Sequence, residues 1–452
     1  MKCTEIIKLI EKRLKEITDV DDALQAEAFA LFEELQNAQL APNFSNSQNE
    51  LISVVKNGVV VPGNLNRSRV EFLVEWTNEV VPILELLNET GKLPKNQPRD
   101  ANFLEFVSKY LNDYINFITS HVHLEAIGVA AVTQISFLSS AIISSIEAFL
   151  SGEPHAAFSK LDMGLQHINS LLEYTSAMMG QNGQPTLYKM RTGGNTNYSA
   201  DEMFHIPFEK RGLVKTNRYS IPGLPCVYLG NTPLICWEEL GRPDLNNVQT
   251  SLFAPKEDIR YIDLSANPAF VRDYLKSVFT KNYGDPSATE PLSSLNTYLQ
   301  IWPLIFVCSI CVRQVNDAFK PEYIIPQMLL QWVRKSNYDG IAYFSTKIDH
   351  YSLCNNWIYT NYAFPVQTLT PNGHCSQLGS KFKVISEALP WQVYRAYRDA
   401  GSTYTMPYER GPETDIELYP NAPIRYAVTD FGRIQEFFDR KFSHEIAGYG
   451  GR

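Results

Sequence analysis

The residues best suited to chemistry lie in short runs between Leu187 and Ser345. In each run, charged or polar side chains adjoin an apolar strand or helix start, which is how a rigid scaffold holds a site. Arginine's planar fork suits a diphosphate and keeps its charge, whereas a carboxylate stabilises a developing positive charge. The set as a whole indicates a site more strongly than any one member; it comprises Arg191, Arg211, Arg218, Tyr219, Tyr228, Glu238, Glu239 and Ser345.

Other chemistries find little support in the sequence. Cys308 and Cys311 have the spacing of a metal-binding pair, but they lie in the apolar run WPLIFVCSICV and no second pair follows. His121 and His123 are similarly isolated, so we expect no bound metal. A phosphate-binding P-loop, a Rossmann fingerprint and the G-x-S-x-G serine elbow are absent from the sequence.

Composition and charge further limit the classes of function that the sequence supports. The chain has 452 residues and a net charge of −9. Residues 1–180 carry 13 Lys and Arg against 23 Asp and Glu, whereas the remainder carries 27 against 26. No basic block is present, which argues against nucleic-acid binding. Seven cysteines without a framework spacing, and an N-terminus without the pattern of a signal peptide, predict a cytoplasmic protein.

The first part of the chain has a helical pattern. Apolar residues recur at three- and four-residue steps in RSRVEFLVEWTNEVVPILELL (67–87), and Pro82 predicts a kink there. GKLPKNQPRD (91–100) is typical of a linker, a helix is expected from about Asn102, and a second apolar stripe runs from Phe158 to Leu172. Residues 1–180 are therefore predicted to form an acidic helical bundle that regulates or oligomerises the protein.

One stretch admits two interpretations. Ala126 to Ile146 contains no charged residue and is long enough to cross a bilayer. Its five serines and Gln134 make insertion unfavourable, so the favoured interpretation is the central, buried helix of the bundle. The alternative is a membrane-facing pore helix.

The sequence pattern changes after residues 175–185, and the domain boundary is expected near residues 180–185. Short β-rich runs then alternate with turns and short helices, which indicates an α+β domain over residues 181–452. The predicted strands are 187–191, 226–229, 250–253, 260–263, 303–312 and 340–344, and the predicted helices are 233–240, 268–279 and 324–335.

The order of the polar runs resembles that of a known family. The region from about residue 185 to residue 365 resembles the RES domain. It contains, in the same order, an arginine, an Arg-Tyr pair, a Val-Tyr-Leu strand, a glutamate and a serine after Asp-Gly-Ile-x-Tyr. Members of that family resemble ADP-ribosyltransferases, whose fold has a split β-sheet. They consume NAD as hydrolases, phosphorylases or transferases, and many are toxins of toxin–antitoxin pairs.

The resemblance implies a role for each matched residue. Glu239, preferred to Glu238 by spacing, stabilises the oxocarbenium-like state as the nicotinamide–ribose bond breaks, and Ser345 donates a hydrogen bond to the substrate. Two arginines hold the diphosphate of NAD. One is Arg191, and the other is Arg218, with Arg211 as the alternative candidate. Tyr228 or Tyr219 stacks on nicotinamide or binds a ribose oxygen.

The chain is longer than the short stand-alone toxins of the family. It has a long N-terminal part before the matched region and about 85 residues after it. These parts predict an NAD-consuming effector of growth arrest or antiviral defence, with an antitoxin, sensor or regulatory partner or self-association through the bundle. Two alternatives stay open: a transferase that modifies a protein target, and a catalytically silent nucleotide-binding module with a partner-docking bundle.

Overall fold

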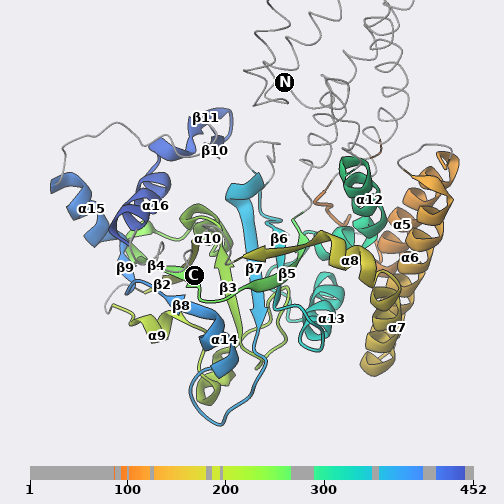
Figure 1. Cartoon of the computed structure of the whole chain (residues 1–452), viewed down its shortest axis with the longest axis horizontal. Helices are drawn as coiled ribbons and strands as arrows, with labels where there is room; N and C mark the ends of the chain where they lie inside the picture. The colour runs from red at the N-terminus through yellow and green to blue at the C-terminus, as the bar shows by residue number, and fades with distance from the viewer. Residues whose placement is uncertain are drawn as a thin grey trace, which may run out of the picture. The chain divides into compact units, whose positions relative to one another are not determined.

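The structure is a computed structural model that describes residues 86, 93–98, 101–122, 127–179, 186–193, 197–265, 290–348, 356–400 and 414–442 (Figure 1). Its α-helices are α5 (Phe103–Ser120), α6 (Gly128–Leu150), α7 (Pro154–His167), α8 (Asn169–Thr175), α9 (Ala200–Met203), α10 (Pro233–Glu239), α12 (Glu290–Cys308), α13 (Ile324–Val333), α14 (Ser376–Lys381), α15 (Trp391–Ala400) and α16 (Asp430–Lys441). Its strands are β1 (Ser176–Met179), β2 (Leu187–Thr192), β3 (Cys226–Gly230), β4 (Val248–Pro255), β5 (Ile259–Leu264), β6 (Gly340–Phe344), β7 (Thr360–Pro365), β8 (Phe382–Val384), β9 (Leu389–Pro390), β10 (Asp415–Tyr419) and β11 (Ala422–Arg425).

A mixed sheet of nine strands organises this part of the chain. The strand order is β1-β5-β6-β7-β3-β2-β4-β8, and β9 also pairs with β4. β5 and β6 are parallel, and the other described pairs are antiparallel. The α+β class is confirmed, and five of the six predicted strands occur as β2 to β6.

The sheet is nearly divided between β2 and β3. These strands share one register pair, Tyr188 with Gly230, whereas β2 pairs with β4 over six positions and β3 with β7 over five. The sheet thus consists of an antiparallel part around β2 and β4 and a mixed part that runs from β1 to β3, joined at one register pair.

The predicted strand at residues 303–312 is wrong, because residues 303–308 form the end of helix α12 and no strand follows them within the run. An unbroken apolar run has no period, so it fits a buried strand and a buried helix equally well. From Tyr298 to Cys308 every side chain is buried. Burial all round explains why the run lacks the polar face of an amphipathic helix.

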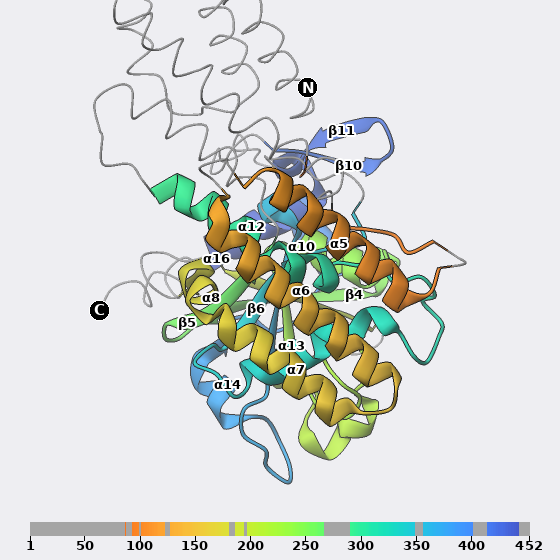
Figure 2. The same ribbon diagram turned by 90° about the vertical axis from the view of Figure 1, so that its right-hand side faces the viewer.

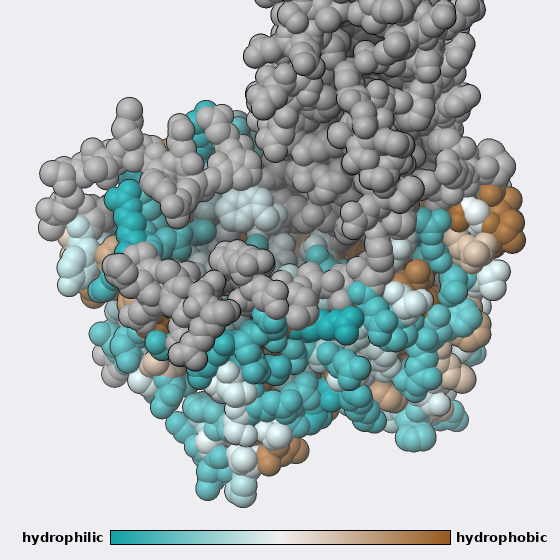
Figure 3. All heavy atoms as spheres, in the orientation of Figure 1, coloured by the Kyte–Doolittle hydropathy of each residue, from teal (hydrophilic) through white to brown (hydrophobic). Residues whose placement is uncertain are grey.

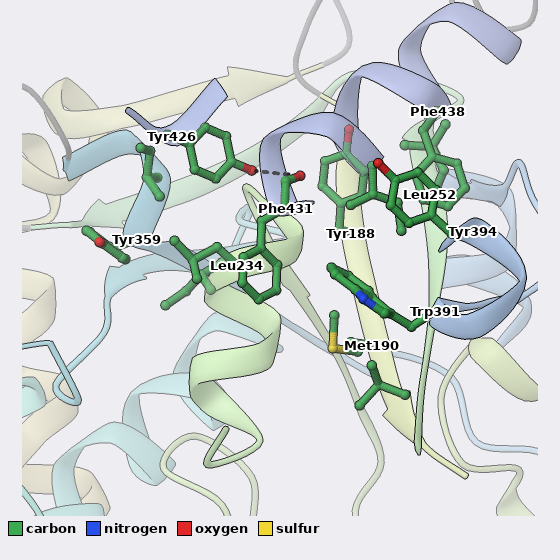
Figure 4. Close-up of a cluster of buried hydrophobic side chains, with 14 of the residues drawn as sticks. Tyr188, Met190, Leu234, Leu252, Tyr359, Trp391, Tyr394, Tyr426, Phe431 and Phe438 are labelled. Atoms are coloured by element: carbon green, nitrogen blue, oxygen red, sulfur yellow. Dashed lines mark hydrogen bonds between the residues drawn. The ribbon is translucent and has the colours of Figure 1, made fainter. Parts of the chain in front are cut away.

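Helix α10 lies against one face of the sheet, in agreement with the predicted helix. Pro233 occupies its first turn, where a missing N–H costs nothing. The hydroxyl of Thr232 accepts a hydrogen bond from the Ile235 amide at 3.2 Å and donates one to the Ile358 carbonyl at 2.9 Å. Leu234 and Ile235 pack in a core with Tyr188 of β2, and α15 and α16 contribute further aromatic rings (Figure 4).

The predicted helices before the sheet are confirmed where the structure describes them. α5 begins at Phe103, and the stripe from Phe158 to Leu172 is carried by α7 and α8, with Leu161, Leu165 and Leu172 fully buried. Residues 67–85, which include Pro82, and the predicted helix 268–279 lie outside the described residues.

The apolar stretch from Ala126 proves to be helix α6, but it is less buried than expected. Among the described helices it alone is long and apolar enough to span a membrane, and 39% of its most apolar window is buried. Val129 is 74% exposed. Core helices of soluble proteins pass the same test of length and composition.

Contacts divide the chain into two compact units. One comprises Met1–Lys92, Ser108–Phe137 and Pro268–Pro303, and the other comprises Leu93–Val107, Leu138–Asn267 and Leu304–Arg452. α7, α8 and the sheet therefore belong to the same unit. The boundary predicted at residues 180–185 lies outside the described residues, and these units do not coincide with a division there.

Candidate active site

A carboxylate, a hydroxyl and an amide from three separate elements meet at one point. Glu239 ends α10, Ser345 follows β6 and Asn361 lies on β7. The Ser345 hydroxyl donates a hydrogen bond to Oε1 of Glu239 at 2.6 Å, and Nδ2 of Asn361 donates to the same oxygen at 2.9 Å. Ser345 is fully buried, whereas the Glu239 side chain is 34% exposed. Two donors therefore fix the carboxylate while it stays accessible from solvent.

Lys347 faces the other oxygen of the same carboxylate. Its Nζ lies 3.7 Å from Oε2 of Glu239, and it also donates to the carbonyl of Glu239, at the C-terminal end of α10. A helix C-terminus carries partial negative charge, which favours a lysine there. The backbone N–H of Lys347 donates to Ser345 Oγ at 3.2 Å, so that Ser345 both donates and accepts.

Arg218 lies close enough to Glu239 for both charges to act on the same tyrosines. The pKa of Tyr343 is raised well above its ordinary value by burial and by the Glu239 carboxylate, while Arg218 opposes this shift. The pKa of Tyr323 is also raised by burial first, and it responds to the same two charges with the same signs. Both phenols are therefore neutral at physiological pH.

The guanidinium of Arg218 is held rigidly. It donates to the carbonyls of Cys308 and Ile310, each at 3.0 Å, and to the hydroxyl of Thr346 at 2.9 Å. Its centre also lies 5.4 Å from the centroid of the Tyr323 ring. The acceptors are neutral, so this arrangement fixes the arginine without neutralising its charge, and an anion can bind there.

The two adjacent glutamates have different roles in the structure. Glu238 is 4% exposed, and its Oε2 forms an ion pair with Nε of Arg242 at 2.7 Å. Nη1 of Arg242 also donates a hydrogen bond to the carbonyl of Leu418 at 3.3 Å. Glu238 is thus part of a structural contact, and Glu239 is the carboxylate that meets Ser345.

Arg191 does not join this group. Tyr188, Gly230, Asn361 and Tyr343 form one row of register partners across β2, β3, β7 and β6, so their side chains share a face. Arg191 is three positions from Tyr188 and lies on the opposite face. There its Nη2 is 3.5 Å from the Phe204 carbonyl, and its guanidinium lies 5.7 Å from the centroid of the Tyr198 ring.

The remaining predicted residues are also outside the immediate surroundings of Glu239. Arg211 is exposed and donates to the Gly223 carbonyl at 2.8 Å. Tyr219 is 1% exposed, and its ring lies 4.6 Å from that of Tyr343, so it supports the site from within the core. Tyr228 donates to the Ser220 hydroxyl at 2.9 Å.

Sequence reasoning missed Asn361, Lys347 and Tyr343. A weak signal existed for Asn361, because an amide in the aromatic strand TNYAFP must find a buried partner. Within the part of the chain that the structure describes, no three His, Cys, Asp or Glu side chains cluster in a way that could hold a metal ion.

Comparison with known proteins places the chain in a family. It is similar over nearly its whole length to a protein of Bacillus subtilis (strain 168) named "Putative toxin YopC", with 35% identity over 444 residues that cover 96% of each chain. The chain belongs to the family of this toxin. No protein-family model matches the chain, and no solved structure is significantly similar to it. The similarity therefore extends over the N-terminal part of the chain as well as over the residues of the sheet.

Proposed function

We propose that this chain is a toxin that consumes NAD by cleaving the bond between nicotinamide and ribose. The contact between Glu239 and Ser345 is the observation that carries the proposal. These residues are 106 positions apart, and each was matched separately to the Glu and Ser of the RES domain. Their hydrogen bond is what a shared active site requires. Arg218, the matched arginine, donates a hydrogen bond to Thr346, the residue that follows Ser345.

The chemistry assigned to the site is substitution at the ribose C1′ carbon. The C1′–N bond breaks, its electron pair stays on the nicotinamide nitrogen, and the ribose becomes an oxocarbenium-like cation. Opposite unit charges about 4 Å apart attract by about 4 kcal/mol at an effective dielectric constant of 20, which corresponds to nearly a thousandfold in rate if expressed only in the transition state. Oε2 of Glu239 accepts neither the Ser345 nor the Asn361 hydrogen bond, so it is the oxygen assigned to this role.

The other site residues bind and orient in this proposal. Arg218 holds the diphosphate through its charge. Ser345 is a positioning residue for the carboxylate rather than a ligand of nicotinamide, because its proton is directed at Glu239. Water or inorganic phosphate accepts the ADP-ribosyl group, and a protein acceptor would make the chain a transferase. The proposal includes a cytoplasmic setting and a protein partner that restrains the toxin.

The decisive experiment follows the fate of NAD. Full-length protein is incubated with NAD, with and without phosphate, and the products are identified by mass spectrometry. We expect release of nicotinamide that Glu239→Gln reduces at least a hundredfold. Glu436→Gln, which changes a partly exposed glutamate on α16, serves as the matched control.

The same two variants are then expressed in bacteria. Growth arrest with a fall in cellular NAD, absent for Glu239→Gln, supports the proposal. Growth arrest with NAD intact would refute it and favour a different target. NAD that is bound but unchanged, with normal growth, would favour a silent nucleotide-binding module.

A further inference from the structure

Tyr343 lies on β6, next to a residue that holds the Glu239 carboxylate. It is the register partner of Asn361 on β7, so the two side chains share one face of the sheet. Asn361 donates from that face to Oε1 of Glu239 at 2.9 Å. Tyrosine is the longer side chain of the pair, and its hydroxyl extends further from the sheet than the asparagine amide. The phenol and the carboxylate therefore lie on the same side of the sheet, one strand apart.

The ring of Tyr343 is held in place by a buried neighbour. Its centroid lies 4.6 Å from that of Tyr219, which is 1% exposed. Helix α13 lies beside β6 (Figures 1 and 2). Gln327 of this helix donates to the carbonyls of Asn217 at 3.0 Å and of Ser220 at 3.3 Å, which fixes the loop that carries Tyr219. The phenol is thus supported by a rigid element, as a preorganised site requires.

The hydroxyl of Tyr343 has no hydrogen-bond partner among the described residues. The side chain is partly exposed, and its oxygen is not sealed from solvent as that of Tyr219 is. The neighbouring polar groups are already occupied, since Ser345 both donates and accepts and Lys347 donates to the Glu239 carbonyl. Burial and the nearby carboxylate raise the pKa of Tyr343 well above its ordinary value. Its phenol is therefore a neutral group that is available to a ligand.

A neutral hydroxyl at this position suits the sugar of the proposed substrate. The 2′-hydroxyl of the nicotinamide ribose is attached to the carbon next to C1′, and C1′ faces Glu239 in the proposed reaction. In glycoside cleavage, hydrogen bonds to the corresponding hydroxyl strengthen in the transition state, because positive charge on the adjacent carbon makes it a better donor. The visible described surface in Figure 3 is largely hydrophilic, which is consistent with recognition of a polar ligand through hydrogen bonds.

We propose that the Tyr343 hydroxyl accepts a hydrogen bond from the 2′-hydroxyl of the nicotinamide ribose, an inference that rests on the proposed cleavage of NAD. Tyr343 then touches the substrate directly and contributes most when charge develops at C1′. No covalent bond to Tyr343 forms or breaks. An interaction that strengthens in the transition state raises kcat more than it lowers KM.

The first test compares two tyrosine variants of the full-length protein. Tyr343→Phe keeps the ring and removes the hydroxyl, and it should lower kcat for nicotinamide release at least tenfold while KM changes little. Tyr362→Phe is the matched control. Tyr362 follows Asn361 on β7 but points to the opposite face, where its hydroxyl lies 3.4 Å from Oδ1 of Asn231. The control should retain most of the activity, and both variants should melt within a few degrees of the wild type.

The second test changes the substrate instead of the protein. The probe is the NAD analogue whose nicotinamide ribose lacks the 2′-hydroxyl. Wild type and Tyr343→Phe should cleave this analogue at the same rate, because the contact is already missing. A merely structural role would slow the variant equally on NAD and on the analogue.

The outcomes separate this inference from the proposed function. An equal slowing on both substrates, or no slowing on NAD, would overturn the role of Tyr343 and leave NAD cleavage intact. Absence of nicotinamide release by the wild type would overturn the proposed function, and the role of Tyr343 with it.

Discussion

At the scale of single residues, the two oxygens of Glu239 are not equivalent. Oε1 accepts two hydrogen bonds within the chain, and Oε2 lies 3.7 Å from the ammonium of Lys347. A carboxylate that is fixed at one oxygen while its side chain stays partly exposed is preorganised, so it need not rearrange as positive charge develops next to it. Asn361 is central to this arrangement.

Asn361→Asp should therefore shift the pH dependence of NAD cleavage. The variant places a second carboxylate 2.9 Å from the first, where the asparagine amide now lies. Two adjacent carboxylates hold a proton more tightly than one, so the acidic limb of the activity profile moves to higher pH. We expect activity at pH 7 to fall tenfold or more. Asn337→Asp, at an exposed asparagine, should leave the profile in place.

Exchanging each glutamate for glutamine should separate stability from activity. Glu238→Gln removes the charge that pairs with Arg242 and should lower the free energy of unfolding by about 1–3 kcal/mol. It should leave most NAD cleavage intact. Glu239→Gln should abolish cleavage and keep the melting temperature within a few degrees. The reverse pattern would show that Glu238 is the working carboxylate.

His205 should make stability depend on pH. Its ring is buried, donates from Nδ1 to the Ile206 carbonyl at 2.7 Å and accepts at Nε2 from the Cys375 amide at 2.8 Å. Burial lowers its pKa to about 4, from 6.5. Between these values the unfolded chain binds the proton and the folded chain does not, so stability falls as the pH drops from 6.5 to 4.

Urea unfolding of the wild type and of His205→Gln at pH 7 and pH 4.5 measures this contribution. We expect the wild type to lose about 1–3 kcal/mol more than the variant over that interval. An equal loss in both proteins would assign the acid sensitivity to other groups.

At the scale of elements, α10 determines where Glu239 lies. The hydroxyl of Thr232 caps this helix and ties it to the residues before β7. Thr232→Val keeps the size of the side chain but removes both hydrogen bonds, at a cost of about 1–2 kcal/mol. We expect a lower melting temperature and a several-fold loss of NAD cleavage. Thr232→Ser retains the hydroxyl and should restore activity toward the wild-type value.

The elements also show what sequence patterns can and cannot provide. Strands β3 and β6 were predictable, because short β-rich runs bounded by turn residues contain their own signal, whereas β7, which carries Asn361, was not among the predicted strands. The run at residues 303–312 was not, since an apolar sequence without a period fits a buried helix as well. The carboxylate and the serine were found through a family resemblance, whereas Asn361 and Lys347 depend on register and on the path of the chain after β6. Neither is encoded locally.

At the scale of the whole sheet, its two faces separate the arginines that the sequence placed together. Arg218 donates to Thr346, next to Ser345, whereas Arg191 lies on the opposite face beside the Phe204 carbonyl. We expect Arg218→Ala to reduce NAD cleavage at least a hundredfold and Arg191→Ala to reduce it less than tenfold. The two variants are compared by their steady-state rates of NAD cleavage, measured at saturating and at limiting NAD. Equal losses would indicate that the substrate reaches both faces at the junction of β2 and β3.

The distances in sequence between the site residues also bear on how a toxin can be made safely. Glu239 has contacts with residues 106 and 122 positions further along the chain. During synthesis from the N-terminus, the carboxylate therefore emerges long before its two hydrogen-bond donors. The site cannot assemble until residue 361 of 452 has left the ribosome. The restraining partner of the proposed function would accordingly have most of the elongation time in which to engage a chain whose site is still incomplete.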